Sequence, residues 1–422
     1  MKKHLLALSA AAVLLAPNAV GAEGFSINEW SAEGFGMGGA RMFAENDAAN
    51  MAYNPASLTK IKGEVAKISA TYISPHGKYK CYDAADREMS YVNGGVGHNR
   101  VHPAWAPGSY YAKQLNEKEY LGFGAYSRFG NSCQFEPGSL PGFNNTSAKI
   151  NGMSIGINYA KKLDNKWSAS LGAEVNYAWL QLDKTVPDAM IGTAVPMGGK
   201  MQVEGESYAL GWNAAANYAF DEKNEMGIVY RSAVNHSMEA NVRAEGLFDV
   251  LLANPTEAYG CVTLPESVMI GYGHKFNDKT RVELNGTWTR WSRFDKFNMY
   301  FDSGSSKESP KNWKDGWRYA IGVEHKLSDK YSLLGGVAHD ESGIPDYYDH
   351  SSEPGADFMV PTGTRTTFTI GGQYHDDKQT VALTIGYMKL GDLYIEGDTF
   401  YDRAKMYDSY TKLVSISYQY NF

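Results

Sequence analysis

The sequence predicts an all-β protein: a fourteen-stranded antiparallel transmembrane β-barrel with an N-terminal hatch, a plug segment, inside its lumen. Three observations predict this fold. A targeting segment precedes the mature chain, alternating apolar and polar residues recur along it, and short polar turns alternate with long loops. No later segment holds the roughly 18 consecutive apolar residues that a transmembrane helix needs. We therefore expect strands to cross the bilayer.

Residues 1–22 have the features of a secretory signal peptide. Two lysines follow the initiator methionine, an apolar run covers residues 5–16, and small residues occupy positions 20–22. The run is too short to span a bilayer, which argues against the alternative of an uncleaved anchor. Glu23 is the expected first residue of the mature chain.

The composition restricts the classes of partner and site. A formal net charge of -7 argues against a nucleic-acid partner. The 29 tyrosines suit a membrane boundary, because each has an apolar ring and a polar tip. The three cysteines, Cys81, Cys133 and Cys261, match no metal motif and form no disulfide framework, although one pair could close between loops. We expect no metal and no cofactor.

Alternation of residue character is clearest at the C-terminus. Apolar or aromatic residues occupy every second position, and polar residues lie between them. The apolar set is Val414, Ile416, Tyr418, Tyr420 and Phe422. A terminal strand ending in phenylalanine resembles the signal that the outer-membrane barrel assembly machinery reads. A soluble β-sandwich can end in the same way, so this segment alone does not decide the fold.

Upstream strands carry charged and amide side chains on their second face. Apolar residues at 171, 173, 175 and 177 alternate with Ser170, Gly172, Glu174 and Asn176. A strand buried on both faces rarely holds glutamate and asparagine. Lipid outside and a polar lumen inside account for both faces together.

The turns predict the number of strands. Six short polar turns occur between alternating runs, at residues 115–118, 163–166, 221–224, 277–279, 328–330 and 376–378. Seven long loops separate them, at roughly 74–103, 129–149, 183–202, 237–262, 294–313, 341–363 and 390–410. These thirteen connections predict fourteen strands. An even number places both termini on one side of the membrane, the periplasm.

The segment 23–63 precedes the barrel, which is predicted to cover residues 64–422. It is rich in Gly, Ala and Asn and has no sustained period. About 40 residues do not easily build a separate core. A fourteen-stranded barrel encloses a lumen that its own side chains do not fill, so we expect the segment to fold inside it as a hatch. The alternative is a loose periplasmic tail.

Two short motifs have structural explanations. Gly152-Met153-Ser154-Ile155-Gly156 matches a hydrolase pattern, but that pattern needs a sharp strand-to-helix turn, and here the serine lies within a strand. His339-Asp340-Glu341 and His375-Asp376-Asp377 are best explained as solvated charge at a strand end and in a turn. We expect no enzyme and no metal site.

Lys314 and Arg318 are candidate ligand-binding residues. They share the non-lipid face of a strand with Ala320, Gly322 and Glu324, in the half nearest an outer loop. A carboxylate entering an apolar chamber needs a cationic partner. The alternative is that Asp315 or Glu324 neutralises both cations within the wall.

Eight stretches in similar order resemble the FadL family of outer-membrane transporters for long-chain fatty acids and other hydrophobic compounds. They are Gly24–Glu29, Gly34–Gly36, Asn46–Asn50, Asn54–Ala56, Leu264–Glu266, Trp288–Phe294, Trp313–Tyr319 and Asp340–Pro345. The long loops 76–103 and 183–262 match least. The resemblance implies a hatch-closed barrel that captures an apolar ligand outside, passes it to an internal site and releases it when the hatch rearranges. Release can be sideways, through a kinked wall strand.

The resemblance also suggests roles for hatch residues. Asn54, Pro55 and Ala56 form a turn by their residue types, and the resemblance implies a hatch element that contacts the wall. Phe25 is an aromatic residue near the mature N-terminus, and we expect it to enter an internal apolar pocket. The apolar group at 247–252 is either a landing groove for ligand or a packing surface for other loops.

The predicted function is passive uptake of long-chain fatty acids by a monomer in the outer membrane of a Gram-negative bacterium. Its surroundings would be outer-membrane lipids and lipopolysaccharide. An aromatic hydrocarbon importer is the alternative within the same class. A general porin and an outer-membrane lipid hydrolase are the alternatives from other classes; the first would lack a plug, and the second would need a Ser–His pair.

Overall fold

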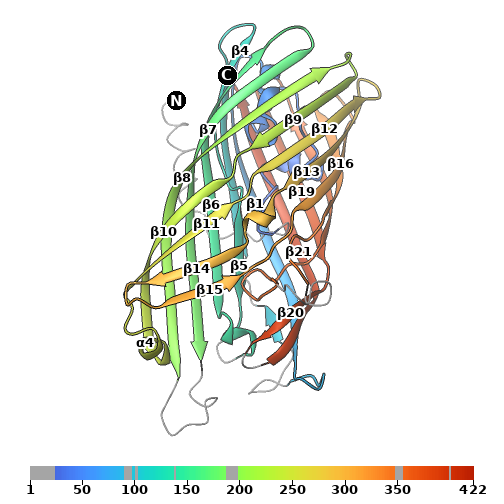
Figure 1. The fold of residues 1–422 in the computed structure, drawn as a ribbon. Coiled ribbons are helices and arrows are strands. Elements are labelled where there is room, and N and C mark those ends of the chain that lie inside the picture. Colours follow the sequence, from blue (N-terminus) through green and yellow to red (C-terminus); the bar gives the residue numbers. More distant parts are fainter. Residues whose placement is uncertain are drawn as a thin grey trace.

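The computed structural model describes residues 24–89, 97–99, 103–136, 139–186, 198–346, 355–398 and 401–422. The predicted signal peptide lies outside the described residues. The chain forms a closed antiparallel barrel of fourteen crossings (Figure 1), which confirms the predicted fold class. The first strand pairs with the last, from Val65 opposite Asn421 to Tyr82 opposite Arg403, and this pairing closes the barrel.

Seven crossings are single segments and seven are two segments in line. The single segments are β1 (Glu64–Tyr82), β6 (Ser147–Lys162), β7 (Trp167–Val186), β8 (Gly199–Ala219), β17 (Tyr331–Asp340), β18 (Arg365–His375) and β21 (Tyr401–Asn421). The two-segment crossings are β2 (Gly97–Asn99) with β3 (Ala104–Gln114), β4 (Glu119–Tyr126) with β5 (Gly130–Gln134), β9 (Asn224–Arg231) with β10 (Val234–Gly246), β11 (Glu257–Leu264) with β12 (Ser267–Lys275), β13 (Thr280–Thr289) with β14 (Lys296–Phe301), β15 (Ser306–Pro310) with β16 (Gly316–Lys326), and β19 (Gln379–Leu390) with β20 (Leu393–Asp398).

The two ends of the barrel differ. The six predicted tight turns all lie at one end, here called the short-turn end, where the C-terminus also lies (Figure 1). In five of these turns an aspartate or asparagine accepts hydrogen bonds from the backbone, and in the turn at 328–330 the Ser328 hydroxyl does so. Asp164 Oδ1 accepts from the N–H groups of Lys166 and Trp167, both at 2.7 Å, which lowers the pKa of the Asp164 carboxyl. The opposite end, which carries the longer connections, is called the long-loop end.

The two faces of the strands have the predicted polarity. On the outside, Ile155 and Leu171 are 55% and 63% exposed, although both are large apolar residues. On the inside, Glu174 and Asn176 are buried. A protein in water would not expose a continuous apolar band of this kind, but lipid would cover it. The alternation therefore identifies the membrane-facing surface.

Several predicted loops are largely strand. β7 and β8 continue to Val186 and from Gly199, within the predicted loop 183–202, and β10 and β11 take up much of 237–262. The predicted loop 390–410 is mostly a hairpin of β20 with β21. Beyond the lipid the outer face becomes polar, so the apolar–polar alternation ends. Backbone hydrogen bonding continues, because each strand still has a neighbour.

Helical structure is confined to short pieces. Within the hatch segment these are α2 (Ala32–Gly36), α3 (Asn50–Tyr53) and the 3-10 helix η1 (Pro55–Lys60). Elsewhere they are η2 (Pro141–Phe143), α4 (Leu247–Leu251) and η4 (Trp291–Arg293). Among the residues that the structure describes, no helix has both the length and the apolar character needed to cross a membrane.

Candidate functional site

Residues 24–63 lie within the barrel and contact strands around its circumference. The backbone N–H of Ala32 donates to Ser417 Oγ on β21 at 2.7 Å, and Ala32 O accepts from Thr384 on β19 at 2.7 Å. The N–H of Met42 donates to Glu283 on β13 at 2.6 Å. These partners lie on separate strands, so the segment is fastened to several sides of the lumen rather than hanging from β1.

Buried ion pairs hold the hatch segment to the wall near the short-turn end. Lys67 of β1 contacts Glu33 and Asp47 of the hatch, at 2.9 and 2.6 Å. Arg41 of the hatch contacts Asp47 and, on β16, Glu324, both at 3.2 Å. A buried charge is tolerated only when it is paired, so Lys67 depends on the hatch being in place, whereas Glu324 also has Arg281 of β13 at 2.8 Å.

A second polar cluster surrounds Glu174, in the middle of β7. Its carboxylate accepts from Arg231 at 2.7 Å, from Tyr126 Oη at 2.9 Å and from Asn213 at 3.0 Å. The other terminal nitrogen of Arg231 donates to the carbonyl of Ala52 in the hatch at 2.6 Å. Glu174 therefore positions an arginine that holds the hatch backbone.

The turn Asn54-Pro55-Ala56 both folds locally and contacts the wall. Asn54 Oδ1 accepts from the N–H of Ala56 at 3.1 Å, and Pro55 is the first residue of η1. Asn54 Nδ2 donates to Asn217 Oδ1 on β8 at 2.7 Å. The turn therefore joins the hatch to the wall through Asn54. Its part in gating stays a prediction.

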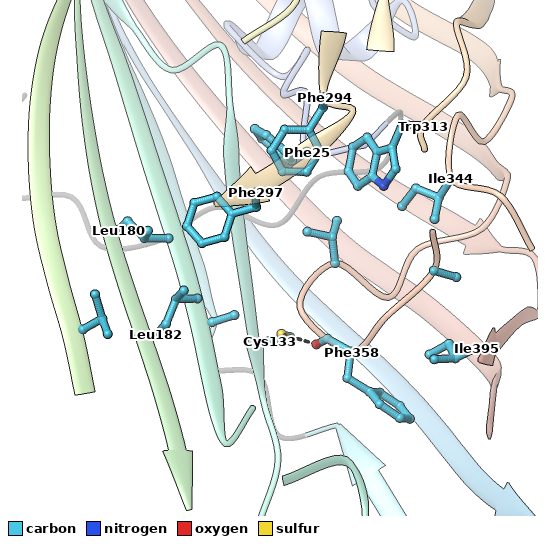
Figure 2. Close-up of a cluster of buried hydrophobic side chains, with 14 of the residues drawn as sticks. Phe25, Cys133, Leu180, Leu182, Phe294, Phe297, Trp313, Ile344, Phe358 and Ile395 are labelled. Carbon is cyan, nitrogen blue, oxygen red and sulfur yellow. Dashed lines mark hydrogen bonds between the residues drawn. The ribbon is translucent and has the colours of Figure 1, made fainter. Parts of the chain in front are cut away.

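Phe25 lies in an aromatic cluster in the middle of the barrel (Figure 2). Its ring centroid is 4.9 Å from that of Trp291, 5.7 Å from that of Phe294 and 5.9 Å from those of Phe129 and Trp313, all edge to face. Gly24 precedes it at a φ of 59°, and a Cβ there would lie 2.6 Å from the Trp291 and Trp313 rings. Only glycine fits so close to these two rings, so Gly24 allows Phe25 to pack into the cluster.

A narrow crevice with about 20 Å³ of free space opens beside Phe25. Its walls come from the hatch, β6, β7, β10, β11 and β14, and from the connections that precede β5, β14 and β18. The lining residues are Phe25, Phe129, Ile150, Gly152, Ala178, Leu180, His236, Met238, Val262, Leu264, Phe294, Phe297 and Met359. Almost all of these side chains are apolar, so the crevice suits a hydrophobic ligand.

The wall is interrupted beside this crevice. β4 ends at Tyr126, β5 begins at Gly130, and the pairing of β3 with β4 starts only at Gly108. The hatch fills the break: the N–H of Ile27 donates to Arg128 O and the N–H of Gly130 donates to Phe25 O, both at 2.8 Å. The hatch therefore takes the place of a neighbouring strand here.

Arg318 and Lys314 occupy different environments. Arg318 is buried; it contacts Asp340 at 2.9 Å and donates to the carbonyl of Gly38 in the hatch at 2.6 Å. The same aspartate contacts Arg365 at 2.7 Å. The predicted neutralising partners were Asp315 or Glu324, and the structure instead gives Arg318 Asp340. Lys314 was expected on the same inner strand face as Arg318, and this was wrong: it lies in the connection before β16, and its side chain is exposed.

The remaining sequence motifs have structural partners. Ser154 Oγ hydrogen-bonds to Asn176 Oδ1 at 2.6 Å, inside the barrel. His339 Nδ1 contacts Thr366 Oγ1 at 3.0 Å. The three cysteines are free thiols, and Cys133 Sγ donates to Phe358 O at 3.0 Å (Figure 2). In α4, at the long-loop end, Val250 and Leu251 are 78% and 63% exposed, while Phe248 packs partly against the central cluster.

The short-turn end has a different character. A vestibule of about 510 Å³ lies between the hatch and the turns, and charged side chains line much of it, among them Arg41, Glu45, Lys275, Lys279, Arg281, Glu324 and Lys326. An apolar molecule leaving by this route would meet water and charge. The break at 127–129 lies instead in the wall itself.

Sequence reasoning did not single out His236, Trp291, Arg231 or Glu174 as site residues. Strand parity was the available signal for Glu174, because a glutamate on an inward face of a barrel strand must be paired. The Trp291 side chain gave no such signal, because its place depends on η4, a short helix within the interruption between β13 and β14.

The barrel is closed, its exterior is apolar, and an interior segment is held in its lumen by ion pairs beside an apolar crevice. These features define an integral membrane β-barrel whose lumen is filled by its own N-terminal segment. The family model described as outer membrane protein transport protein (OMPP1/FadL/TodX) matches residues 13–422. The chain therefore belongs to this family, and it is an outer-membrane protein.

Relatives and solved structures agree with this assignment. The long-chain fatty acid transport protein of Escherichia coli K12 is 24% identical over 401 residues, covering 86% of this chain and 88% of that protein. Outer membrane protein P1 of Haemophilus influenzae is 25% identical, covering 94% and 91%. A Pseudomonas aeruginosa FadL homologue superposes with a TM-score of 0.82 at 17% identity, covering 94% of this chain and all of that one. The Pseudomonas putida toluene transporter TodX gives 0.69 at 16%, covering 94% and 99%. These two structures support the fold.

Proposed function

We propose that this protein takes up hydrophobic molecules passively across the outer membrane and that its main ligands are long-chain fatty acids. The apolar crevice beside Phe25, inside a lumen filled by the hatch, is the observation that carries the proposal. A water-filled porin offers an alkyl chain no apolar contacts, whereas this crevice does. The family includes a relative named for transport of long-chain fatty acids.

The proposed path runs from the long-loop end to the break in the wall. Val250 and Leu251 of α4 offer an exposed apolar landing surface. The ligand then displaces Phe25 and occupies the crevice, and the hatch residues Asn54, Pro55 and Ala56 shift with it. It leaves sideways past residues 127–129, because that route avoids the charged vestibule. Both termini are periplasmic in this orientation.

The protein acts as a monomeric transporter and not as an enzyme. Its partners are the hydrophobic ligand, outer-membrane lipids, lipopolysaccharide and, during assembly, the barrel assembly machinery. Ser154 supports this proposal, because its hydroxyl bonds to Asn176 on the next strand rather than to a histidine.

An uptake assay tests the proposal. The protein is produced in cells that lack their own outer-membrane fatty-acid transporter, and uptake of radiolabelled oleate is measured. We expect it to restore oleate uptake and to leave uptake of a small sugar unchanged. Restored sugar uptake would indicate a general porin, and no restored uptake of oleate or toluene would refute the proposal.

Aromatic hydrocarbons are the second candidate ligands. Phe25, Phe129, Phe294 and Phe297 contribute rings to the crevice, and its lining includes neither lysine nor arginine. An uncharged ring system would fit such walls without a cationic partner. Faster uptake of labelled toluene than of oleate in the same cells would favour this alternative.

We further propose that Lys314 receives a fatty-acid carboxylate at the entrance. Its side chain is exposed, and the adjacent Trp313 packs against Phe25. A charge-assisted hydrogen bond contributes roughly 1.5–3 kcal/mol, so Lys314→Ala should weaken oleate binding by about tenfold or more. Binding of an alkylbenzene should be unchanged. A matched loss for both ligands, measured on folded protein in detergent, would assign Lys314 to structure instead. Arg318→Ala is the comparison, and it should lower stability because Asp340 loses a buried partner.

A further inference from the structure

His236 is a buried polar side chain with no hydrogen-bond partner among the described residues. It lies on β10 opposite Val262 of β11, and strand parity turns it inward between the buried Val234 and Met238. The residue is 1% exposed. Neither Nδ1 nor Nε2 has a partner. A buried imidazole normally satisfies at least one of its nitrogens, so this arrangement needs an explanation.

The imidazole faces the apolar crevice. Of the side chains that the structure places around this space, His236 alone carries a nitrogen or oxygen atom. The other walls are hydrocarbon or thioether, from residues such as Leu180, Leu264 and Phe297. An apolar residue in its place would avoid the cost of an unsatisfied buried group. The two ring nitrogens of His236 are therefore placed to form hydrogen bonds with a molecule that enters the crevice.

We propose that His236 binds the polar head group of the transported ligand, which is a single-headed amphiphile rather than a pure hydrocarbon. This inference rests on the proposed function and refines its substrate class. A neutral imidazole donates from one nitrogen and accepts at the other, so it matches a hydroxyl or an undissociated carboxyl group. The alkyl part of the ligand then lies along the phenylalanine and leucine walls. The head group would supply the hydrogen-bond partner that His236 lacks, and His236 would supply one to the buried head group.

Two probes separate the head group from the chain. 1-Dodecanol and dodecane have the same number of carbon atoms and differ by one hydroxyl. Both are titrated into folded protein in the same detergent, and each affinity is compared between variants, so that partition into micelles cancels. In His236→Phe, which keeps a ring of similar size, dodecanol binding should weaken by about tenfold and dodecane binding should stay the same or strengthen. His236→Asn, which keeps a donor and an acceptor, should retain part of the preference for dodecanol.

The control variant is His339→Phe, the same substitution on the outer face of β17, and it should change neither affinity. An equal loss of dodecanol and dodecane in His236→Phe would show that His236 only shapes the crevice and would overturn the inference. Unchanged binding of both probes would overturn it as well. In either case binding of dodecane to the unmodified protein still supports a hydrophobic site. If the unmodified protein binds neither probe, the crevice is not the ligand site and the proposed function fails with it.

Discussion

Deletion of residues 24–56 is expected to turn a nearly closed protein into a steadily conducting channel in planar lipid bilayers. The hatch fills a lumen that the wall side chains do not reach across, because a fourteen-stranded barrel is too wide. Its removal leaves Lys67, Glu283 and Glu324 without their hatch partners, and water and ions will solvate them. The effect is large because it changes the contents of the pore rather than one contact.

Single-channel recording measures this effect, and a heat-dependent gel shift checks that the deleted protein is a folded barrel. Glu45→Gln is the control. Glu45 belongs to the hatch, but its side chain is 54% exposed and its contacts with Lys60 and Lys275 are 3.4 and 3.3 Å long. This variant should stay closed. Equal conductance before and after deletion would mean that residues 24–56 do not seal the lumen.

Glu174→Ala is expected to produce the largest loss of stability from a single substitution. It leaves Arg231 and Arg128 buried beside a missing anion, and it removes the acceptor for Tyr126 and Asn213. Breaking a buried pair by removing one partner costs about 3–5 kcal/mol. Glu174→Gln keeps the size and the hydrogen-bonding capacity of the side chain, so it should lose less.

Urea unfolding in lipid vesicles, followed by tryptophan fluorescence, measures the change in the free energy of unfolding. Glu119→Ala is the matched control, because Glu119 pairs with Lys161 at 3.3 Å on an exposed surface and such pairs contribute little. The Glu174 variant should also show more frequent channel openings, since Arg231 would no longer be held where it binds Ala52 O. A loss in Glu174→Ala no greater than that in Glu119→Ala would contradict the assigned role of the cluster.

The two predictions concern the same contacts between the hatch and the wall. Buried ion pairs hold the hatch to the wall, and hydrogen bonds from residues 25 and 27 close the break at 127–129. A ligand that displaces Phe25 would therefore disturb the segment that seals the wall. In the proposed function, this coupling would link occupation of the crevice to release of the ligand without a separate energy source.

The sequence by itself determined the barrel, because its signals are local. A strand between lipid and lumen must alternate, so Ile155 and Glu174 could each be assigned a face without any knowledge of their neighbours. Tight turns have their own residue chemistry, and they set the number of crossings.

Only the tertiary structure decided how the interior is arranged. Arg318 could be assigned to the inner face, but its choice of Asp340 depends on the register between β16 and β17 and on the nearby carbonyl of Gly38. The sequence did not show how far the strands extend beyond the membrane, because backbone hydrogen bonding there does not require alternating apolar side chains. His236 became visible as an unpaired group only when β6, β7, β10, β11 and β14 surrounded it with hydrocarbon. Whether a polar side chain is satisfied depends on which distant residues reach it, and this information is not local in the chain.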